Sequence, residues 1–378
     1  MYRGALYPAV CLALALAACG EPQARQESGP ELQTLEAVPG RPPAFPRRIW
    51  AACDFELDRK DVVWLGEHER SDIPAYPGNQ TAARAVPLAG GPVKIIGIKP
   101  VSYPRMGFDQ ASRNKVYFRY RLEGEGRVFI QLFARGDHAC HRAELKGLGR
   151  GEWSEAVVDL GGPGGGPGFP LPAGLRMYGL VMALEPSPQG GDCELIVDDV
   201  ICFADGGAEQ AAAMPFPGRV ICLWGFDVVD EYHPWTHTDY RVLRKGEMLR
   251  NDWGAAQALP RANSPGKRIR LIIDPPQQVG RTTRLSFRYR LDGASSFQVQ
   301  IFDLTDRDNR HIALENVDQG AWQQADLDFT GQGIKNDGNQ TPFLAGNLVD
   351  DIFFFPLQAG EEAELLIDDV VLYDAAEK

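Results

Sequence analysis

Several common signatures of catalysis are missing from this sequence. It contains no Gly-x-Ser-x-Gly, no His-Glu-x-x-His and no phosphate-binding loop, and only six of its 378 residues are histidine. These absences argue against a serine hydrolase, a zinc peptidase or a P-loop NTPase. Two histidine pairs, His138/His141 and His233/His237, are isolated in the sequence, and we expect neither to form a metal or catalytic site.

An excess of positive charge is also missing, since 51 acidic residues outnumber the 39 lysines and arginines. The formal net charge is −12 at pH 7, which gives no electrostatic support to nucleic-acid binding. No cysteine pair has the spacing of a metal site. The sequence does not fix the pairing of Cys53, Cys140, Cys193, Cys202 and Cys222.

Helical periodicity is almost absent, and short strands take its place. The 41 glycines and 28 prolines suit many strands joined by turns. Such a pattern predicts an all-β chain built as β-sandwiches. The expected strands are residues 93–98, 116–122, 127–133, 155–160, 176–184, 194–203, 268–273, 285–291, 296–302, 324–329, 348–355 and 364–373.

A strand with two adjacent carboxylates occurs twice. Residues 194–203 read Glu-Leu-Ile-Val-Asp-Asp-Val-Ile-Cys-Phe, and residues 364–373 read Glu-Leu-Leu-Ile-Asp-Asp-Val-Val-Leu-Tyr. Apolar residues on both sides of the two-residue alternation predict that both faces of each strand are covered. A carboxylate there needs a strong partner, because burying an unpaired charge is costly.

Other landmarks repeat with the Asp-Asp pair at an offset of about 170 residues. In the first copy they are the Phe55–Trp64 spacing, residues 118–122 and the Gly-x-Trp that ends at Trp153. In the second copy they are the Phe226–Trp235 spacing, residues 287–291 and the Gly-x-Trp that ends at Trp322. Because these landmarks occur in the same order in both halves of the chain, they predict a tandem duplication of one domain. The expected domains are residues 48–205 and 219–378, joined by a Pro- and Gly-containing linker at 206–218.

The chain begins with an apolar run, residues 4–18, which is too short to span a membrane but suits a signal peptide, expected at residues 1–18. Its end, Leu16-Ala17-Ala18-Cys19-Gly20, resembles the lipobox of bacterial lipoproteins, in which the cysteine is lipidated and becomes the mature N-terminus. A secretory signal with a chance cysteine is the alternative. Residues 19–47 are rich in Pro, Gly, Gln and Glu and predict a disordered tether.

Each repeat resembles the jelly-roll carbohydrate-binding modules of the galactose-binding-like superfamily. The shared features are the opening Phe-Glu or Phe-Asp, the tryptophan that follows, the Gly-x-Trp and the closing Asp-Asp strand. The resemblance implies a structural calcium between the first and last strands of each domain. The implied metal residues are Glu56 and Asp198 in the first repeat, and Asp227 and Asp368 in the second. An arginine or a backbone N–H as the carboxylate partner is the alternative.

Arginine and glutamine recur on the outward side of the middle strands. Phe118, Tyr120 and Leu122 are expected to face the core, which leaves Arg119 and Arg121 outward. Such side chains can bind sugar hydroxyls beside an aromatic ring, and arginine forks favour an acidic glycan. An ordinary solvated sheet face is the alternative. The candidate ligand-binding residues are Arg119, Arg121, Gln131, Arg288, Arg290, Gln298, Gln300 and Trp253, with Trp50 and Trp224 as further stacking candidates.

We therefore predict a non-catalytic lipoprotein of the bacterial cell envelope, anchored by lipid at Cys19 in the outer membrane or at the cell surface. Its predicted partner is a polysaccharide, bound through tandem β-sandwich modules, and no nucleic acid is expected. A structural or protein-interaction module without a sugar site is the alternative. A jelly-roll polysaccharide lyase or hydrolase is less favoured, because no histidine lies on the candidate strands.

Overall fold

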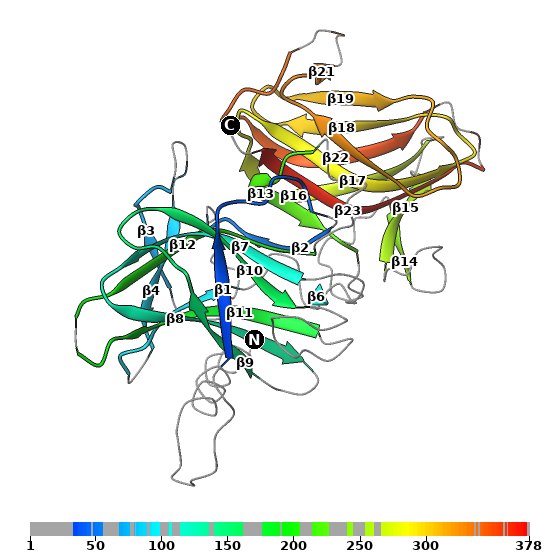
Figure 1. Ribbon diagram of the computed structural model, residues 1–378. Coiled ribbons are helices and arrows are strands. Elements are labelled where there is room, and N and C mark those ends of the chain that lie inside the picture. The colour runs from blue at the N-terminus through cyan, green and yellow to red at the C-terminus, as the bar shows by residue number, and fades with distance from the viewer. Residues whose placement is uncertain are drawn as a thin grey trace, which may run out of the picture. The chain divides into compact units, whose positions relative to one another are not determined.

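The computed structural model is all-β in the part of the chain that it describes (Figure 1). The chain divides into two compact units, residues 1–212 (domain 1) and residues 213–378 (domain 2). None of the described residues lies in a helix, so they include no candidate for a membrane-spanning helix. The described residues are 33–46, 48–55, 68–75, 79, 81–88, 91–98, 106–107, 114–135, 140–161, 176–189, 191–204, 214–226, 240–244, 254–260, 266–335, 338, 341–357, 360 and 362–375.

Domain 1 is a sandwich of two sheets. We call the sheet that holds its first and last core strands the terminal sheet, and the other the middle sheet. The terminal sheet has the order β3–β4–β12–β7–β10, with β2 also paired to β12, and the middle sheet has the order β5–β11–β8–β9, with β6 paired to β11. The strands are β1 (Gln33–Pro39), β2 (Arg48–Cys53), β3 (His68–Ser71), β4 (Ala82–Pro87), β5 (Lys94–Ile98), β6 (Met106–Gly107), β7 (Asn114–Glu123), β8 (Gly126–Arg135), β9 (Cys140–Lys146), β10 (Ser154–Gly161), β11 (Arg176–Pro186) and β12 (Glu194–Ala204).

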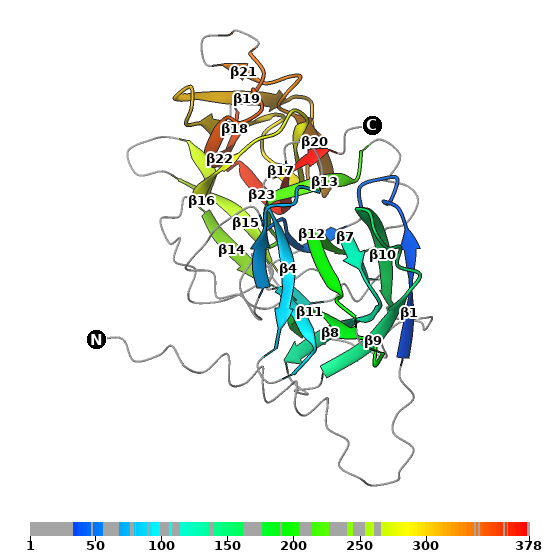
Figure 2. The ribbon, with the colours of Figure 1, turned by 90° about the vertical axis from the view of Figure 1, so that its left-hand side faces the viewer.

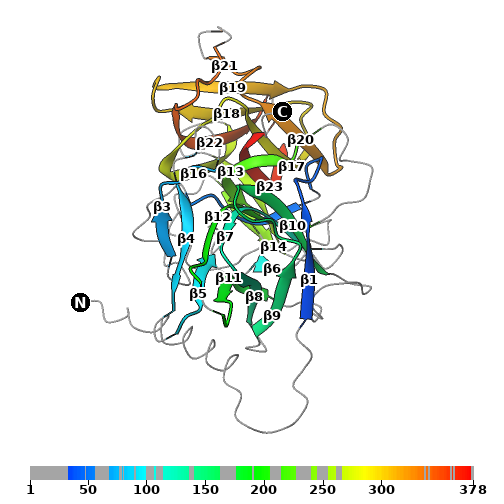
Figure 3. The ribbon, with the colours of Figure 1, turned by 60° about the vertical axis from the view of Figure 1, so that its left-hand side comes forward.

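Domain 2 repeats this plan. Its terminal sheet has the order β14–β15–β23–β17–β20, with β13 on β23, and its middle sheet has the order β16–β22–β18–β19–β21. Figure 3 shows β19, β18, β22 and β16 following one another across the middle sheet. The strands are β13 (Pro217–Trp224), β14 (Tyr240–Arg244), β15 (Gly254–Pro260), β16 (Lys267–Gln278), β17 (Thr283–Asp292), β18 (Phe297–Asp303), β19 (Asp308–Leu314), β20 (Gln323–Asp328), β21 (Ile334–Lys335), β22 (Leu348–Pro356) and β23 (Glu364–Ala375).

Strand pairing confirms the tandem duplication. The β12–β7, β7–β10, β11–β8 and β8–β9 pairs of domain 1 have the counterparts β23–β17, β17–β20, β22–β18 and β18–β19 in domain 2. Registers agree too, since Ala156 opposes Phe118 in one domain and Ala325 opposes Phe287 in the other. All the expected strands are present, and the prediction of two tandem β-sandwiches is confirmed. The expectation of a disordered tether at residues 19–47 is wrong for residues 33–39, which form β1 of domain 1 and bury Leu35 and Ala37.

The core of each domain lies between its two sheets and follows the two-residue alternation. In β17 and β18 the inward residues include Phe287, Leu291, Phe297, Val299 and Ile301, all fully buried. Burying each such side chain contributes about 1.5–3 kcal/mol relative to leaving it exposed. Since glutamine and arginine take the intervening positions, the sequence pattern itself fixes which side of each strand faces outward.

Candidate functional site

The repeated Asp-Asp pair forms a β-bulge in the last strand of each domain. The second aspartates, Asp199 and Asp369, adopt left-handed backbone conformations with φ of 45° and 47°. In domain 1 the bulge inserts one extra residue after Asp198, so the core positions of β12 pass from Val197 to Val200. The residues between core positions are buried as well, which confirms that both faces of these strands are covered.

An arginine from the neighbouring strand faces each bulge. Arg119 Nη1 lies 2.9 Å from Asp199 Oδ2, and Arg288 Nε lies 3.7 Å from Asp369 Oδ2. The Asp199 side chain is 0% exposed and that of Arg119 is 11% exposed. A carboxylate so deeply buried depends on its cation, because removing one member of a buried pair leaves an uncompensated charge.

The second arginine of each strand also has a partner within its own domain. Arg121 Nη2 lies 2.8 Å from Glu123 Oε1, and Arg290 Nη2 lies 2.8 Å from Asp292 Oδ2. These ion pairs explain why both repeats keep arginine at these positions without invoking a ligand.

The candidate arginines and glutamines lie in different layers. The arginines are on β7 and β17 in the terminal sheets, whereas Gln131 is on β8 and Gln298 and Gln300 are on β18 in the middle sheets. The expectation that they share one outward face is therefore wrong. The short connections from β7 to β8 and from β17 to β18 cross from one layer to the other and do not form hairpins within a sheet.

A polar and aromatic row crosses the outward side of the middle sheet of domain 2. Arg270 on β16 is opposite Phe353 on β22, Phe353 is opposite Gln300, and Gln300 is opposite His311 on β19. Side chains that oppose one another in a sheet point to the same side. The next row places Gln298 opposite Phe355. We call the surface formed by Arg268, Arg270, Gln298, Gln300, His311, Phe353 and Phe355, all of them half-buried, the Phe353 face.

Contacts within the Phe353 face hold its side chains in place. The rings of Phe353 and Phe355 are nearly parallel, with centroids 5.8 Å apart and an interplanar angle of 20°. The guanidinium carbons of Arg268 and Arg270 lie 5.3 and 5.7 Å from the Phe353 centroid. Arg270 also binds both carboxylate oxygens of Asp351, at 2.9 and 2.7 Å. The face is therefore preorganised, and the charge of Arg270 is offset by Asp351.

The equivalent face of domain 1 buries its aromatic ring under an arginine, since Arg142 lies opposite Gln131 with its guanidinium carbon 3.9 Å from the Phe129 centroid. Val181 and Ala183 stand where domain 2 has Phe353 and Phe355, and together with Ile95, Phe129 and Phe133 they form a buried cluster. Gln131, the counterpart of Gln300, is only 3% exposed. Domain 1 therefore offers no comparable surface among the residues that the structure describes.

The implied calcium residues are only partly described. Glu56 and Asp227 lie outside the described residues, while Asp198 and Asp368 are both 0% exposed. In the described part of the chain, no three or more His, Cys, Asp and Glu side chains are grouped so as to hold a metal ion.

Hydrogen-bond donors surround the carboxylate of Asp198. Its Oδ1 accepts from the backbone N–H of Asp199 at 2.9 Å, and its Oδ2 accepts from Asn79 Nδ2 at 2.8 Å. The backbone N–H of Ala75 donates to Asn79 Oδ1 at 2.7 Å, which fixes the amide with its NH₂ toward the carboxylate. Both oxygens of Asp198 thus accept hydrogen bonds from described groups, and calcium at this carboxylate stays a prediction.

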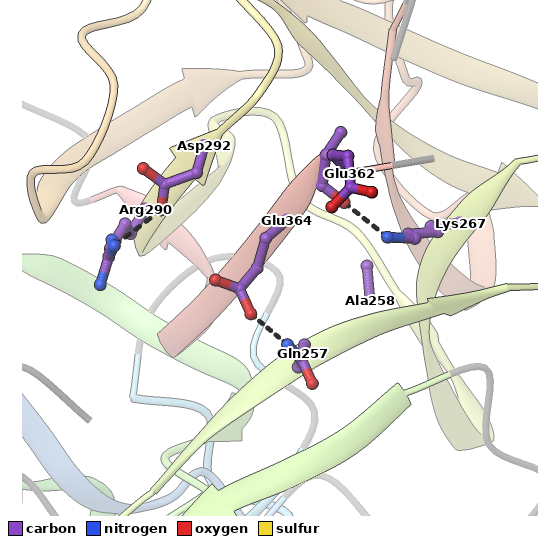
Figure 4. A pocket seen from close by; sticks show the side chains of 8 residues that line it. Gln257, Ala258, Lys267, Arg290, Asp292, Glu362 and Glu364 are labelled. Carbon is purple, nitrogen blue, oxygen red and sulfur yellow. Dashed lines mark hydrogen bonds and ion pairs between the residues drawn. The ribbon is translucent and has the colours of Figure 1, made fainter. Parts of the chain in front are cut away.

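A polar pocket of about 390 Å³ lies at one end of the terminal sheet of domain 2 (Figure 4). Lys267 Nζ donates to the Ala363 carbonyl oxygen at 2.8 Å, Gln257 binds Glu364, and Arg290 binds Asp292. The pocket is lined by Gln257, Ala258, Lys267, Arg290, Asp292, Glu362, Ala363 and Glu364.

Domain 1 repeats these contacts at the aligned positions. Lys94 Nζ donates to the Cys193 carbonyl oxygen at 2.5 Å, and Arg84 lies 3.0 Å from Glu194. A set of contacts that both domains keep between the same strand ends is explained by the fold. The pocket is therefore not our preferred ligand site, although it contains the predicted residue Arg290.

The remaining aromatic and sulfur candidates do not add to a site. Trp253 lies outside the described residues, Trp50 is a buried part of the domain 1 core, and half-buried Trp224 packs against the domain 2 core. Among the described cysteines, Cys53 and Cys202 are both free and both buried, and no disulfide joins them.

Sequence reasoning missed Phe353, Phe355, Arg268 and Arg270. Residues 352–355 read Ile-Phe-Phe-Phe, an unbroken apolar run in which alternation cannot tell the outward rings from the inward ones. The available signal was the alternation Lys-Arg-Ile-Arg-Leu at residues 267–271, which places both arginines on the side opposite the core residues Ile269 and Leu271.

Comparisons with known proteins give structural neighbours only. No family model and no curated protein matches the chain. Solved structures similar to it include the tandem family 22 carbohydrate-binding modules of Xyn10C from Paenibacillus barcinonensis, with a TM-score of 0.30 and 11% identity over 89% of this chain and 100% of that one.

Two further neighbours belong to different kinds of protein. The family 11 carbohydrate-binding module of the cellulase Lic26A-Cel5E from Clostridium thermocellum has a TM-score of 0.27 and 10% identity, over 37% of this chain and 84% of that one. The insecticidal crystal protein Cry7Ca1 from Bacillus thuringiensis has a TM-score of 0.23 and 11% identity, over 70% of this chain and 52% of that one. Two of these three structures are carbohydrate-binding modules.

Proposed function

We propose that this chain binds a polysaccharide through the Phe353 face of domain 2. The observation that carries the proposal is the pair of nearly parallel, half-buried rings of Phe353 and Phe355, with the amides of Gln300 and Gln298 opposite them on β18. Aromatic rings supply rigid apolar contact for the carbon skeleton of a sugar. Glutamine both donates and accepts hydrogen bonds, as sugar hydroxyls require.

The dimensions of the face favour a polymer over a single sugar. The row from Arg270 to His311 crosses four strands, so its backbones span about 14 Å at the usual spacing of about 4.8 Å. A row of this length can contact more than one sugar unit of a chain.

Charge on the face shifts the expected ligand toward neutral polysaccharides. Because Asp351 accepts from Nε and Nη2 of Arg270, the charge of that guanidinium is already offset, which reduces its attraction for a sugar carboxylate. The same ion pair argues for binding without catalysis, since Asp351 is held by arginine and is poorly placed to act as a base.

A protein-interaction module is the second candidate function. Phe and Arg side chains grouped on one face are also enriched at protein interfaces, so the same surface suits a protein partner. The two functions predict different results when the chain is tested for binding to a panel of polysaccharides.

The place of action that we propose is the bacterial cell envelope. The signal-like residues 1–18 and the lipobox ending at Cys19 support lipid anchoring, and residues 19–32, the part of the expected tether that precedes β1, would hold the domains away from the membrane. Residues 1–32 lie outside the described part of the chain, so this proposal rests on the sequence.

The test is retention of the purified full chain in gels that contain neutral or acidic polysaccharides. We expect the wild type to be retarded by at least one neutral polysaccharide, and the double variant Gln298→Ala/Gln300→Ala to migrate freely. Gln324→Ala is the matched control, because Gln324 is a half-buried glutamine on the terminal sheet. If the wild type binds nothing on a broad panel, the protein-interaction function is the better one.

A further inference from the structure

In domain 1 one strand closes the seam between the two sheets. The first part of β1 runs parallel to β9, with Leu35 opposite Leu145, and its last part runs antiparallel to β10, with Ala37 opposite Val158. Figure 2 shows β1 beside β9 and β10. Leu35 and Ala37 are 4% and 5% exposed, so this strand completes the core at the edge of the sandwich.

In the part of domain 2 that the structure describes, the same two edges occur without a strand between them. The positions aligned with the β1 contacts are residues 312–314 of β19 and 325–327 of β20. In the described part of domain 2, β20 pairs only with β17, and β19 pairs with β18 and, at Arg310 and His311, with β21. Residues 312–314 and 325–327 therefore form a pair of sheet edges that we call the open seam.

Apolar side chains along the open seam are incompletely covered. Ile312 and Leu314 pack against the domain 2 core but stay half-exposed, whereas their counterparts Ala143 and Leu145 are 0% and 5% exposed. Exposed edges with apolar side chains are templates for pairing with another strand.

We propose that the open seam of domain 2 accepts an extended strand of a partner polypeptide, which adds to β19 and β20 as β1 adds to β9 and β10. Main-chain hydrogen bonds would supply much of the affinity, and alternate side chains would supply specificity. The strand that fits the equivalent seam, Gln33–Pro39, defines the partner as a segment of about seven residues with small or aliphatic side chains at alternate positions.

One charge distinguishes the partner from β1 itself. Glu36 of β1 is opposite Lys146 in domain 1, and the residue aligned with Lys146 in domain 2 is Glu315. Glutamate opposite glutamate is unfavourable, so the partner strand carries Lys or Arg at that position. This site is separate from the Phe353 face and does not depend on glycan binding.

The experiment follows amide hydrogen exchange of the full chain while a synthetic peptide is added. The probe spans residues 31–41 with Glu36→Lys. Comparison peptides are the unchanged sequence and the probe with Leu35→Asp and Ala37→Asp. We expect exchange at 312–314 and 325–327 to slow about tenfold with the lysine probe, less with the unchanged peptide, and not at all with the aspartate peptide.

A variant of the chain itself complements the comparison of peptides. Leu314→Asp places a charge at a half-exposed edge position, and we expect it to lose the protection while the circular dichroism spectrum of the folded chain is kept, although the lost packing lowers the melting temperature. No slowing at the open seam with millimolar probe, or slowing only at 143–146 of domain 1, would overturn the proposal. If the seam is protected without peptide, and more so at high protein concentration, the occupant is a second copy of this chain and the proposed partner is wrong.

Discussion

At the level of single residues, the buried carboxylate of Asp199 determines what Arg119 does. A carboxylate with no exposure and a guanidinium 2.9 Å away form a unit that the fold cannot lose in part. The sequence showed the aspartate and the arginine in both repeats, and it suggested an arginine partner as the alternative to calcium. It did not pair them, because the pairing depends on the bulge that turns Asp199 outward.

The two arginines are expected to differ in their contribution to stability. Arg119→Met leaves Asp199 buried without its cation, which should cost about 3–5 kcal/mol of the free energy of unfolding. Arg288→Met should cost less, because Arg288 Nε lies 3.7 Å from Asp369 Oδ2, against 2.9 Å for the pair in domain 1. Urea unfolding of the full chain measures both losses, and a larger loss for Arg288→Met would contradict this description of the bulge.

At the level of strands, alternation predicted the elements and their inward faces but not their layers. Phe118, Tyr120 and Leu122 lie in the core as expected. The turn at Gly124 could join β7 to β8 within one sheet or across the sandwich, and sequence periodicity is the same in both cases. That ambiguity is why the arginines and glutamines were assigned to one face.

Calcium binding near the Asp-Asp strands remains a prediction, and we expect removal of calcium to affect the two domains differently. The residue of the second repeat that aligns with Asn79 is Asp252, which lies outside the described residues, so the amide donor of domain 1 is replaced by an oxygen donor in the sequence of domain 2. We expect chelation to lower the melting temperature of domain 2 and to leave that of domain 1 unchanged. Calorimetry of the full chain with EDTA and with added calcium gives both transitions.

The opposite pattern would count against this assignment. A shift confined to domain 1 would mean that Asn79 does not exclude a cation at Asp198. No shift in either transition would remove calcium from both domains.

At the level of the whole molecule, the sequence predicted the duplication, but it did not predict that the two domains differ in the outward faces of their middle sheets. Domain 2 keeps an aromatic and polar face where domain 1 has the buried cluster around Phe129 and Val181. Both versions satisfy the same strand pattern, since an outward position tolerates either a covered apolar residue or a half-exposed aromatic one.

The proposed anchor belongs to this scale as well. Because β1 begins at Gln33, the proposed tether is limited to residues 19–32, for which a random coil would have a dimension of roughly 20 Å. We expect the wild type to fractionate with membranes, and Cys19→Ser to be released or left unprocessed, because the lipid attachment point is lost. Membrane fractionation and mass spectrometry of the N-terminus are the measurements. A soluble wild type that retains Met1 would contradict the proposal.

The most direct measurement is a calorimetric titration of the full chain with a soluble oligosaccharide of the polysaccharide that retards it. We predict one binding site per chain, because only domain 2 presents the Phe353 face among the described residues. Phe353→Ala/Phe355→Ala should weaken binding at least tenfold, about 1.4 kcal/mol, while Arg290→Gln should leave it unchanged. Two sites per chain, or a single site that survives the loss of both rings and is lost in Arg290→Gln, would contradict the account.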